Sequence, residues 1–240
     1  MTATAARIGI VGAGRLGRAL ALRLAGRYEI TLADIEPKLT KQFTKRHGLR
    51  FCYPDDVPAD NDVVLLCVPP AAVHRALLDL ARAARRTARP HRLLCLDTAT
   101  SVESAAPDTT GLEPLDVIGL RPIGQYAAIQ RGEPAVFVTA DRRLPMLQGL
   151  VGDLGLVIHG DERLVGTLNR QATTLALRAC DAAWEQLAPL CPDDAARRAA
   201  IRNVFAGTAM DYPPSPDNTY IAALRDRMAE APGPQPVGAA

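Results

Sequence analysis

The chain has 240 residues, of which 48% are hydrophobic and 4% aromatic, and its formal net charge is +2. This length fits one large domain, or one domain with a smaller one, around a core of Ala, Leu and Val. The scattered Lys and Arg argue against nucleic acid as a partner, and no apolar segment approaches the ~20 residues that a membrane span requires.

The five cysteines are odd in number and include no C-x-x-C pair, so they predict free thiols. Cys67 and Cys95 lie inside apolar runs, which favours buried positions. Free thiols suit a reducing compartment, and Met1 to Ala6 is too short for a secretory signal, so we expect a cytoplasmic protein. We find no metal-ligand spacing and expect no metal site.

The first motif is a strand, a glycine turn and a helix. The apolar run Ile8–Val11 predicts the strand, Arg15–Ala25 predicts the helix, and G-A-G-R-L-G (residues 12–17) joins them. Gly12 permits the tight turn, Gly14 lets a pyrophosphate approach the backbone, and Gly17 lets the helix pack closely on the strand. The phosphates would then lie at the helix N-terminus, which predicts a dinucleotide-binding site.

The second strand, Glu29–Ala33, ends in Asp34, about 20 residues past the turn, where an acid can bind a ribose 2′-hydroxyl. A carboxylate there repels a 2′-phosphate, so Asp34 favours NAD(H) as the cofactor. NADP(H) is the alternative, because Lys38 and Lys41 on the next helix could counter that repulsion.

Strands continue to alternate with helices as far as Gly160, which predicts an α/β fold with a Rossmann-type, doubly wound, mostly parallel sheet. The further predicted helices are Pro37 to about His47, Ala71–Arg86 and Leu144–Leu154, and the further strands are Asp62–Val68, Arg92–Asp97, Val117–Leu120, Ala135–Thr139 and Leu156–His159.

After Gly160 the sequence is Ala/Leu-rich and predicts helices only: Asp161–Leu190, a second helix from Asp193-Asp194 to about Met210, and a last one over Asn218–Ala231. We therefore predict a dinucleotide-binding domain at 1–160, a short all-helical dimerisation and substrate domain at 161–231, and a flexible tail at 232–240. Three helices in about 70 residues are too few to bury their own apolar faces, and a second copy of the chain is the simplest partner, so we predict a homodimer.

The segment SPDNTYIAALRDRMAE (Ser215–Glu230) resembles the one that closes pyrroline-5-carboxylate reductases, where Ser-Pro-Gly-Gly-Thr-Thr opens a helix. Leu66–Pro70 stands where that family has an apolar strand ending in Lys-Pro, and Arg121-Pro122 matches its Met-Pro-Asn turn. The chain thus resembles that family from Arg7 to about Glu230. The substrate segments diverge: Asn169–Thr174 replaces a Gly-Ser-Gly-Pro-Ala segment, and Asp217 and Asn218 replace the two glycines.

The resemblance implies an NAD(P)H-dependent reductase that transfers hydride to the C=N bond of a small cyclic imine. Reduction of the C=O bond of an oxo compound is the next expectation. One alternative is an oxidation like that of prephenate or β-hydroxyacid dehydrogenases, although Asn169 is not the lysine expected in the hydroxyacid enzymes. Another is a dinucleotide-binding protein without catalysis.

By resemblance, Thr219 holds a substrate carboxylate at the start of the last helix, although Asp217 beside it would repel such a group. The residues predicted to border the substrate and act in catalysis are Thr219, Asp181 and Asn169. The residues predicted to bind the cofactor are Gly12, Gly14, Arg15, Leu16, Gly17, Asp34, Val68, Pro69 and Thr98.

Overall fold

The computed structural model describes residues 6–87, 91–97, 111–210, 212, 214, 221, 223–225 and 228. The chain divides into two compact units, Met1–Ala172 and Thr173–Ala240. The division falls inside the long helix α8 (Arg163–Leu187), whereas the sequence places a boundary before it. An α/β unit followed by helices is the predicted fold class, which is confirmed.

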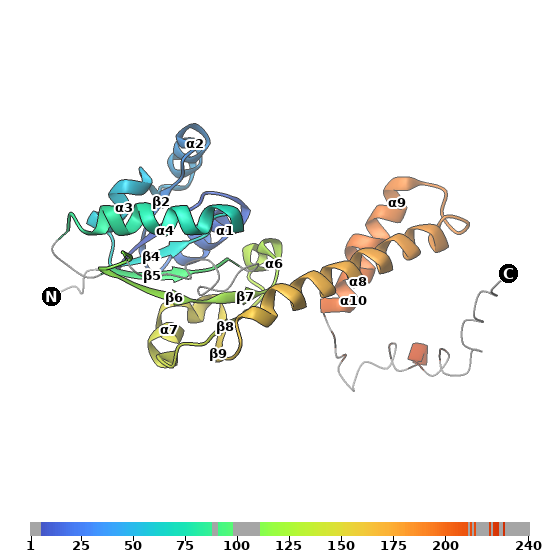
Figure 1. The fold of residues 1–240 in the computed structure, drawn as a ribbon. Coiled ribbons are helices and arrows are strands. Elements are labelled where there is room, and N and C mark those ends of the chain that lie inside the picture. The colour runs from blue at the N-terminus through green and yellow to red at the C-terminus, as the bar shows by residue number, and fades with distance from the viewer. Residues whose placement is uncertain are drawn as a thin grey trace. The chain divides into compact units, whose positions relative to one another are not determined.

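The first unit is built on a sheet of parallel strands in the spatial order β3-β2-β1-β4-β5-β6 (Figure 1). The chain starts in the middle, builds outward to β3, and returns to place β4 beside β1. The order therefore reverses between β1 and β4, and parallel sheets of this type bind ligands beyond the carboxyl ends of the strands at that point. The strands are β1 (Arg7–Val11), β2 (Glu29–Ala33), β3 (Arg50–Cys52), β4 (Val63–Leu66), β5 (His91–Cys95) and β6 (Leu115–Gly119). Only the short β3 has no counterpart in the sequence prediction.

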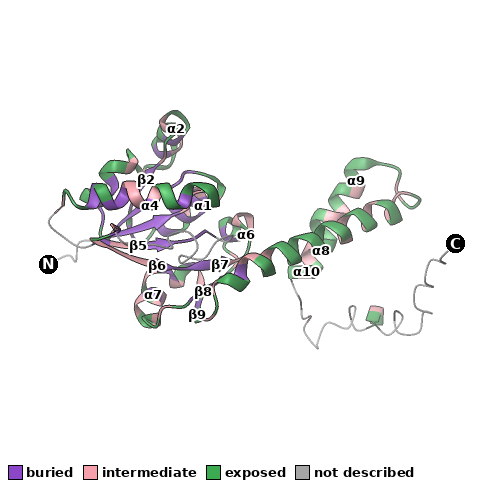
Figure 2. Ribbon diagram, in the orientation of Figure 1, coloured by how far each residue is buried: buried purple, intermediate pink, exposed green. Residues whose placement is uncertain are grey.

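Both faces of this sheet are buried, which explains why its strands are apolar almost throughout (Figure 2). On one face, Ile8 and Ile10 of β1 share a core cluster with Leu20 of α1 (Arg15–Leu24). The helix α2 (Pro37–His47) adds Phe43 to the edge of that cluster. On the other face, Leu66 of β4 packs with the short α3 (Val57–Asp60) and with α4 (Pro70–Ala84).

The strands after Leu120 form a second, smaller sheet rather than extending the first. β7 (Arg121–Ile123) is antiparallel to β8 (Ala135–Thr139), which is parallel to β9 (Gly155–His159). The sequence predicts one continuous sheet with a turn at 121–123, and this is wrong, because the chain begins a new strand directly after β6. The connecting helices are α6 (Tyr126–Arg131) and α7 (Leu144–Val151), and α7 passes into a 3₁₀ turn at Gly152–Leu154.

The second unit contains the C-terminal part of α8 and a second helical segment. α9 (Asp194–Ala199) is capped by Asp193, whose Oδ1 accepts a hydrogen bond of 2.8 Å from the Ala196 N–H. A π-helical turn at Ala200–Phe205 interrupts the predicted continuous helix before α10 (Ala206–Met210). The predicted last helix, Asn218–Ala231, lies mostly outside the described residues, and the tail at 232–240 lies wholly outside them. None of the described helices has both the length and the apolar composition to cross a bilayer.

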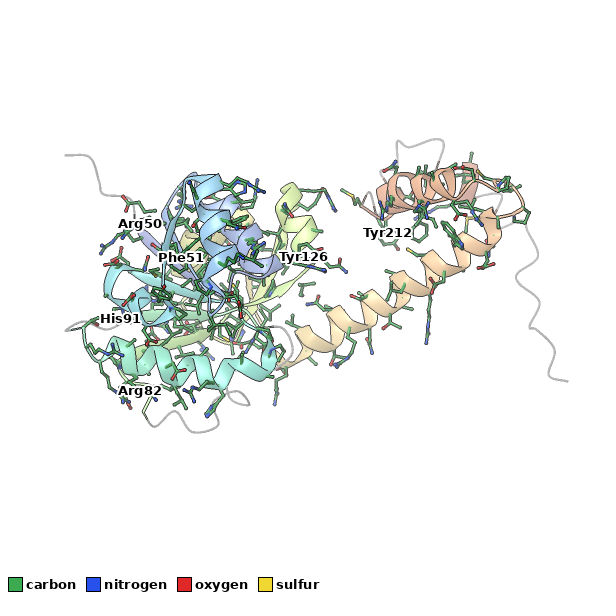
Figure 3. The ribbon with its side chains drawn as sticks, turned by 90° about the horizontal axis from the view of Figure 1, so that it is seen from above. Arg50, Phe51, Arg82, His91, Tyr126 and Tyr212 are labelled. Carbon is green, nitrogen blue, oxygen red and sulfur yellow. The ribbon has the colours of Figure 1, made fainter. Side chains whose placement is uncertain are left out.

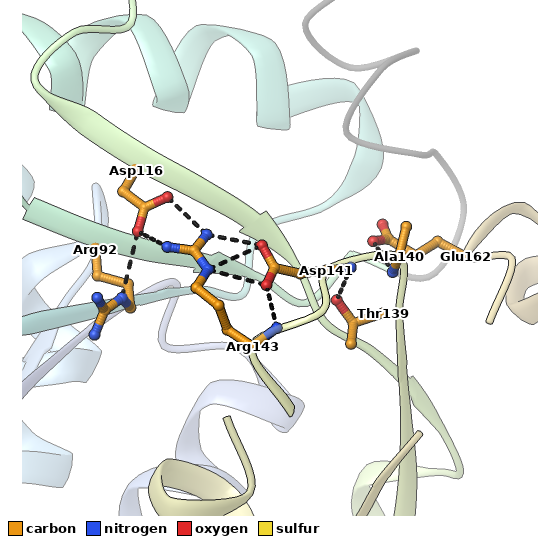
Figure 4. A network of polar contacts seen from close by, with 7 residues as sticks. All are labelled: Arg92, Asp116, Thr139, Ala140, Asp141, Arg143 and Glu162. Atoms are coloured by element: carbon orange, nitrogen blue, oxygen red, sulfur yellow. Dashed lines mark hydrogen bonds and ion pairs between the residues drawn. The ribbon is translucent and has the colours of Figure 1, made fainter. Parts of the chain in front are cut away.

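A network of charged side chains ties the first sheet to the loop after β8 (Figure 4). The Arg143 Nη1 lies 2.6 Å from the Asp116 Oδ2 on β6, and its Nη2 lies 2.7 Å from the Asp141 Oδ2. Arg92 on β5 approaches Asp116 from the other side at 3.4 Å. The hydrogen bonds from Arg143 lower the pKa of both aspartates. A carboxylate whose folded pKa is lowered adds stability above its ordinary pKa and loses it as the pH falls through the folded value.

We predict that Arg143→Met lowers the free energy of unfolding by about 1 kcal/mol at neutral pH, an amount kept small because the groups are partly exposed. The difference from the unmodified protein should shrink as the pH falls through the lowered pKa values of the two aspartates, because both carboxyl groups then become protonated in either protein. Urea unfolding across this pH range measures the effect, with the exposed neighbour Arg142→Met as control. A loss that stays constant with pH would show that Arg143 contributes by packing alone.

Candidate functional site

The glycine turn brings three backbone segments into direct contact. Gly12 has a φ of +103°, and a Cβ added to it would overlap the backbone carbonyl of Cys67 after β4. A Cβ on Gly17 would overlap the Gly12 carbonyl oxygen, so α1 can lie this close to β1 only without a side chain there. Gly14 differs, because a Cβ there would meet nothing within 4 Å. The open space at Gly14 leaves the backbone N–H groups at the start of α1 accessible to a ligand.

The Asp34 carboxylate lies beside the glycine turn and stabilises it by hydrogen bonds. Its Oδ2 accepts a hydrogen bond of 2.6 Å from the Ala13 N–H in the turn, and its Oδ1 accepts one of 2.9 Å from the Glu36 N–H. The carboxylate therefore connects the end of β2 to the glycine turn and to the approach of α2. A carboxylate has about four acceptor positions, so these two bonds leave capacity for a ribose hydroxyl.

A cavity of about 750 Å³ extends from the turn along the carboxyl end of β4. Five residues predicted from the sequence line it together: Gly12, Gly14, Asp34, Val68 and Pro69. The structure adds Ile35, which is 86% exposed, and the loop residues Tyr53 and Pro54. Tyr53 and Pro54 are not predicted from the sequence, because they follow β3, a strand too short to show a periodic pattern. Its remaining lining includes Glu36, Asp55, Ala72, Arg75, Ala76 and Asp79.

The charged side chains lining this cavity are mostly acidic. Asp34, Glu36, Asp55 and Asp79 face a single cation, Arg75. The Arg75 Nε donates to the Asp79 Oδ2 at 2.7 Å, and this hydrogen bond lowers the pKa of Asp79. Arg75 is thereby already paired, so the cavity has an excess of negative charge.

Three described residues that were predicted to bind the cofactor do not line this cavity: Arg15, Leu16 and Gly17. Arg15 is exposed and its guanidinium stands over the ring of Tyr126 on α6, with the Arg15 Cζ 5.4 Å from the ring centroid. Leu16 packs against the core cluster on the α1 face, so only its backbone is available to a ligand. Thr98 lies outside the described residues.

Beyond β5 and β6, the carboxyl edge of the sheet contains a buried cation. Arg121 is 1% exposed, its Nη1 lies 3.7 Å from the Asp97 Oδ2, and its Nε lies 3.3 Å from the Glu162 Oε2. Glu162 also accepts a hydrogen bond of 3.0 Å from the Ala140 N–H. Breaking a buried ion pair by removing one partner is strongly destabilising. Through Asp97 and Glu162, Arg121 thus connects the ends of β5 and β8 to the start of α8.

This network positions one of the predicted substrate residues. Asn169 on α8 donates from its Nδ2 to the Pro122 carbonyl oxygen at 2.9 Å, so Asn169 and the 121–123 segment do lie together. Asp181 is exposed further along α8, in the second unit. Thr219 lies outside the described residues. The roles of these three residues stay predictions.

The cysteines show no sign of a reactive thiolate. All five are free, and Cys95 is buried. Burial is the main cause that raises the pKa of Cys67 and Cys95, and it raises the pKa of Cys52 to about 12 with help from Asp56. These three thiols are therefore protonated at neutral pH and behave as small apolar side chains.

Comparison with known proteins supports this arrangement. Residues 7–88 match the model of a family described as "NADP oxidoreductase coenzyme F420-dependent". No curated protein matches the chain in sequence. The matched segment holds the glycine turn, Asp34, Val68 and Pro69, which are the residues that line the cavity.

Solved structures match over most of the chain. A pyrroline-5-carboxylate reductase from Coxiella burnetii shares 15% identity, with 97% of this chain and 87% of that chain covered and a TM-score of 0.71. An imine reductase from Aspergillus terreus shares 15% identity, with 97% and 81% covered and a TM-score of 0.56. A 3-hydroxyisobutyrate dehydrogenase from Mycobacterium tuberculosis shares 18%, with 77% and 66% covered and a TM-score of 0.61. The predicted resemblance to pyrroline-5-carboxylate reductases is confirmed, and at these identities it establishes a shared fold.

Proposed function

We propose that the chain is a reductase that uses NAD(H) to deliver hydride to the C=N bond of a small cyclic imine. The observation that carries this proposal is the cavity at the point where the strand order reverses, which joins the open turn at Gly14 to Asp34 and to Val68 and Pro69. The similarity in fold to pyrroline-5-carboxylate reductases and to an imine reductase supports the choice of a C=N substrate.

The residues present fit a dinucleotide. The pyrophosphate would lie over Gly14 at the N-terminus of α1, where backbone N–H groups and the helix dipole favour anions. Asp34 would accept hydrogen bonds from the adenine ribose, and Ile35 would lie beside the adenine. Val68 and Pro69 would direct the other half of the cofactor along the carboxyl edge of the sheet. The acidic lining favours NAD(H), since a 2′-phosphate there would meet several carboxylates and only one cation, already paired.

The proposed reaction does not require a strong acid or base among the side chains. A bound reduced nicotinamide would supply a hydride to the carbon of the protonated imine; the C=N π electrons would move to nitrogen, which already carries its proton, so that the product is a neutral amine. A protonated imine is already electrophilic, so the protein must mainly position the substrate and exclude water. Asn169, held against Pro122, would border the substrate. Thr219 and Asp181 stay proposed members of this site.

The dehydrogenase alternative is less well supported. A hydroxyacid dehydrogenase is expected to have a lysine where this chain has Asn169, and here the amide of Asn169 is engaged with a backbone carbonyl. The similarity to 3-hydroxyisobutyrate dehydrogenase is one of fold. A protein that binds the dinucleotide without catalysis is the second alternative, and turnover distinguishes it from both enzymes.

We further propose that the protein is a homodimer whose second unit meets its copy. Large apolar side chains are exposed on that unit, among them Leu175 at 64%, Val204 at 68% and Tyr212 at 73%. A groove of about 780 Å³ runs between α8 and the segment of α10, lined by Leu187, Ile201 and Phe205. Exposed apolar patches of this kind are typical of protein–protein contacts.

We predict that light scattering at micromolar concentration shows a dimer, because association would remove the exposed apolar groove from water. Val204→Glu should shift the protein toward the monomer, since it places a charge at the exposed groove. Arg178→Glu, a charge change on the exposed surface of α8, is the control. A monomer at every soluble concentration would contradict this proposal and leave the reductase proposal to be decided by turnover.

We predict that NADH binds at least tenfold more tightly than NADPH, the equivalent of about 1.4 kcal/mol. Asp34→Asn keeps one acceptor oxygen but removes the charge, so it should narrow the gap mainly by improving NADPH binding. Fluorescence titration with both cofactors measures this. Glu29→Gln removes a charge from the exposed other end of β2 and should leave the ratio unchanged. Equal affinities for the two cofactors in the unmodified protein would contradict the assignment of Asp34.

We predict opposite effects at two glycines of the turn. Gly14→Val should leave the free energy of unfolding within about 0.5 kcal/mol, because its side chain enters open space, and should abolish NADH binding. Gly17→Ala should lower the free energy of unfolding by about 1–3 kcal/mol, because its Cβ overlaps the Gly12 carbonyl. Urea unfolding and NADH titration separate the two effects. Undiminished NADH affinity in a folded Gly14→Val protein would mean that the turn is only structural.

Turnover decides the reaction. We expect NADH oxidation with a cyclic imine in a panel that also contains 2-oxo acids, and no oxidation of prephenate or 3-hydroxy acids with NAD. Asn169→Ala should lower kcat/KM by about tenfold, the loss expected for one misplaced contact at the substrate, with NADH affinity kept. Asn203→Ala, an exposed amide on the second unit, is the control. Activity confined to hydroxy acids would favour the dehydrogenase, and none with any compound would favour the binding protein.

A further inference from the structure

A second cavity in the first unit lies apart from the one that holds the proposed cofactor site. It measures about 320 Å³ and lies between α1, α2 and α6. The two cavities share no lining residue. Its principal lining side chains are Arg15, Arg18, Phe43, Arg46, His47 and Tyr126.

Three arginines converge on this cavity, and no Asp or Glu is among the described residues that line it. Arg15 and Arg18 come from successive turns of α1, and Arg46 comes from the last turn of α2. Like charges placed together repel one another, and a protein surface usually intersperses the two signs. The lining is therefore complementary to an anion.

Aromatic rings hold two of these guanidinium groups in place. The Arg15 Cζ is 5.4 Å from the ring centroid of Tyr126, which Figure 3 labels, and the Arg18 Cζ is 5.1 Å from that of Phe43. Phe43 in turn packs against His47, with ring centroids 4.5 Å apart. Stacked guanidinium groups lose less side-chain freedom when they bind a ligand, so the site is partly preorganised.

Arg18 also has an unsatisfied donor. Its Nε is buried and has no hydrogen-bond partner among the residues that the structure describes, although the residue as a whole is only half-buried. A buried donor of a charged group without an acceptor costs free energy, which an anion in the cavity would offset. The fork of an Arg side chain matches the oxygens of a phosphate group in particular.

We propose that this cavity binds the phosphate group of a small metabolite, at a site separate from the cofactor. Arg18 and Arg46 are its principal ligands, and Arg15 contacts it from the edge of the glycine turn. The site is independent of the proposed reductase activity, because none of its lining residues other than Arg15 is assigned to the cofactor.

Calorimetric titration with inorganic phosphate at constant ionic strength tests this proposal on the full-length protein. We expect binding by the unmodified protein and at least a tenfold loss of affinity in Arg46→Gln, whose side chain is exposed and whose removal should not affect folding. Arg18→Lys keeps the charge but not the fork and should lose affinity as well. Arg142→Gln removes an equivalent charge outside the cavity and should bind phosphate normally.

The glycine turn is the competing anion site, and Gly14→Val separates the two. We expect Gly14→Val to keep phosphate binding and Arg46→Gln to keep NADH binding. Phosphate binding that is absent, that persists in Arg46→Gln, or that disappears only in Gly14→Val would overturn the proposal. A loss of NADPH but not NADH affinity in Arg46→Gln would also overturn it, because the arginines would then serve a cofactor 2′-phosphate. Failure of NADH binding or turnover in the unmodified protein bears on the reductase alone.

Discussion

The close approach of backbone to backbone at the glycine turn is the constraint on which the site depends. Gly12 faces the Cys67 carbonyl and Gly17 faces the Gly12 carbonyl, so β1, β4 and α1 meet with no side chain between them. Because this contact fixes where α1 begins, it also fixes the free N–H groups at that end of the helix. The Ala13 N–H then reaches the Asp34 carboxylate at 2.6 Å, which brings β2 into the same arrangement. Contacts within the protein therefore determine the geometry of the turn without a ligand.

The same geometry distinguishes the glycines that the packing of the fold requires from the one that leaves the backbone open to a ligand. Gly12 and Gly17 have no space for a side chain, whereas Gly14 faces open space. Gly14 is the N-cap of α1, a position at which glycine is preferred over alanine, so helix capping is one physical reason for a glycine there. The open space beside Gly14 is a separate feature, and it supports a functional interpretation of the turn because a ligand could approach the backbone.

Much of the first unit could be predicted from the sequence, because its strands are apolar runs buried on both faces and its helices have a clear apolar stripe. The turn, Asp34, Val68 and Pro69 follow from this, since each directly adjoins a predicted strand. The sequence could not show that β7 begins a second sheet, because Pro122 reads as a turn residue and the pairing with β8 is non-local. The place of Tyr53 at the cavity cannot be predicted for a related reason: it depends on β3, whose three residues are too few for a periodic pattern. Arg121 is a lone cation directly after an apolar run, but its partners Asp97 and Glu162 are distant in sequence, so the sequence does not show the buried network.

Charge distinguishes the cavity along Asp34 from the cavity along Arg18, and this difference determines which of them favours an anion. The cavity along Asp34 presents four carboxylates and one paired cation, while the cavity along Arg18 presents three arginines and no described acid. In the proposed complex, a dinucleotide would have its pyrophosphate at the glycine turn, where neutral backbone donors rather than side-chain charges would bind it. An additional phosphate group is then disfavoured on the acidic side and favoured on the basic side. Arg15, which follows Gly14 and stacks on Tyr126, lines the basic cavity and is absent from the lining of the acidic one.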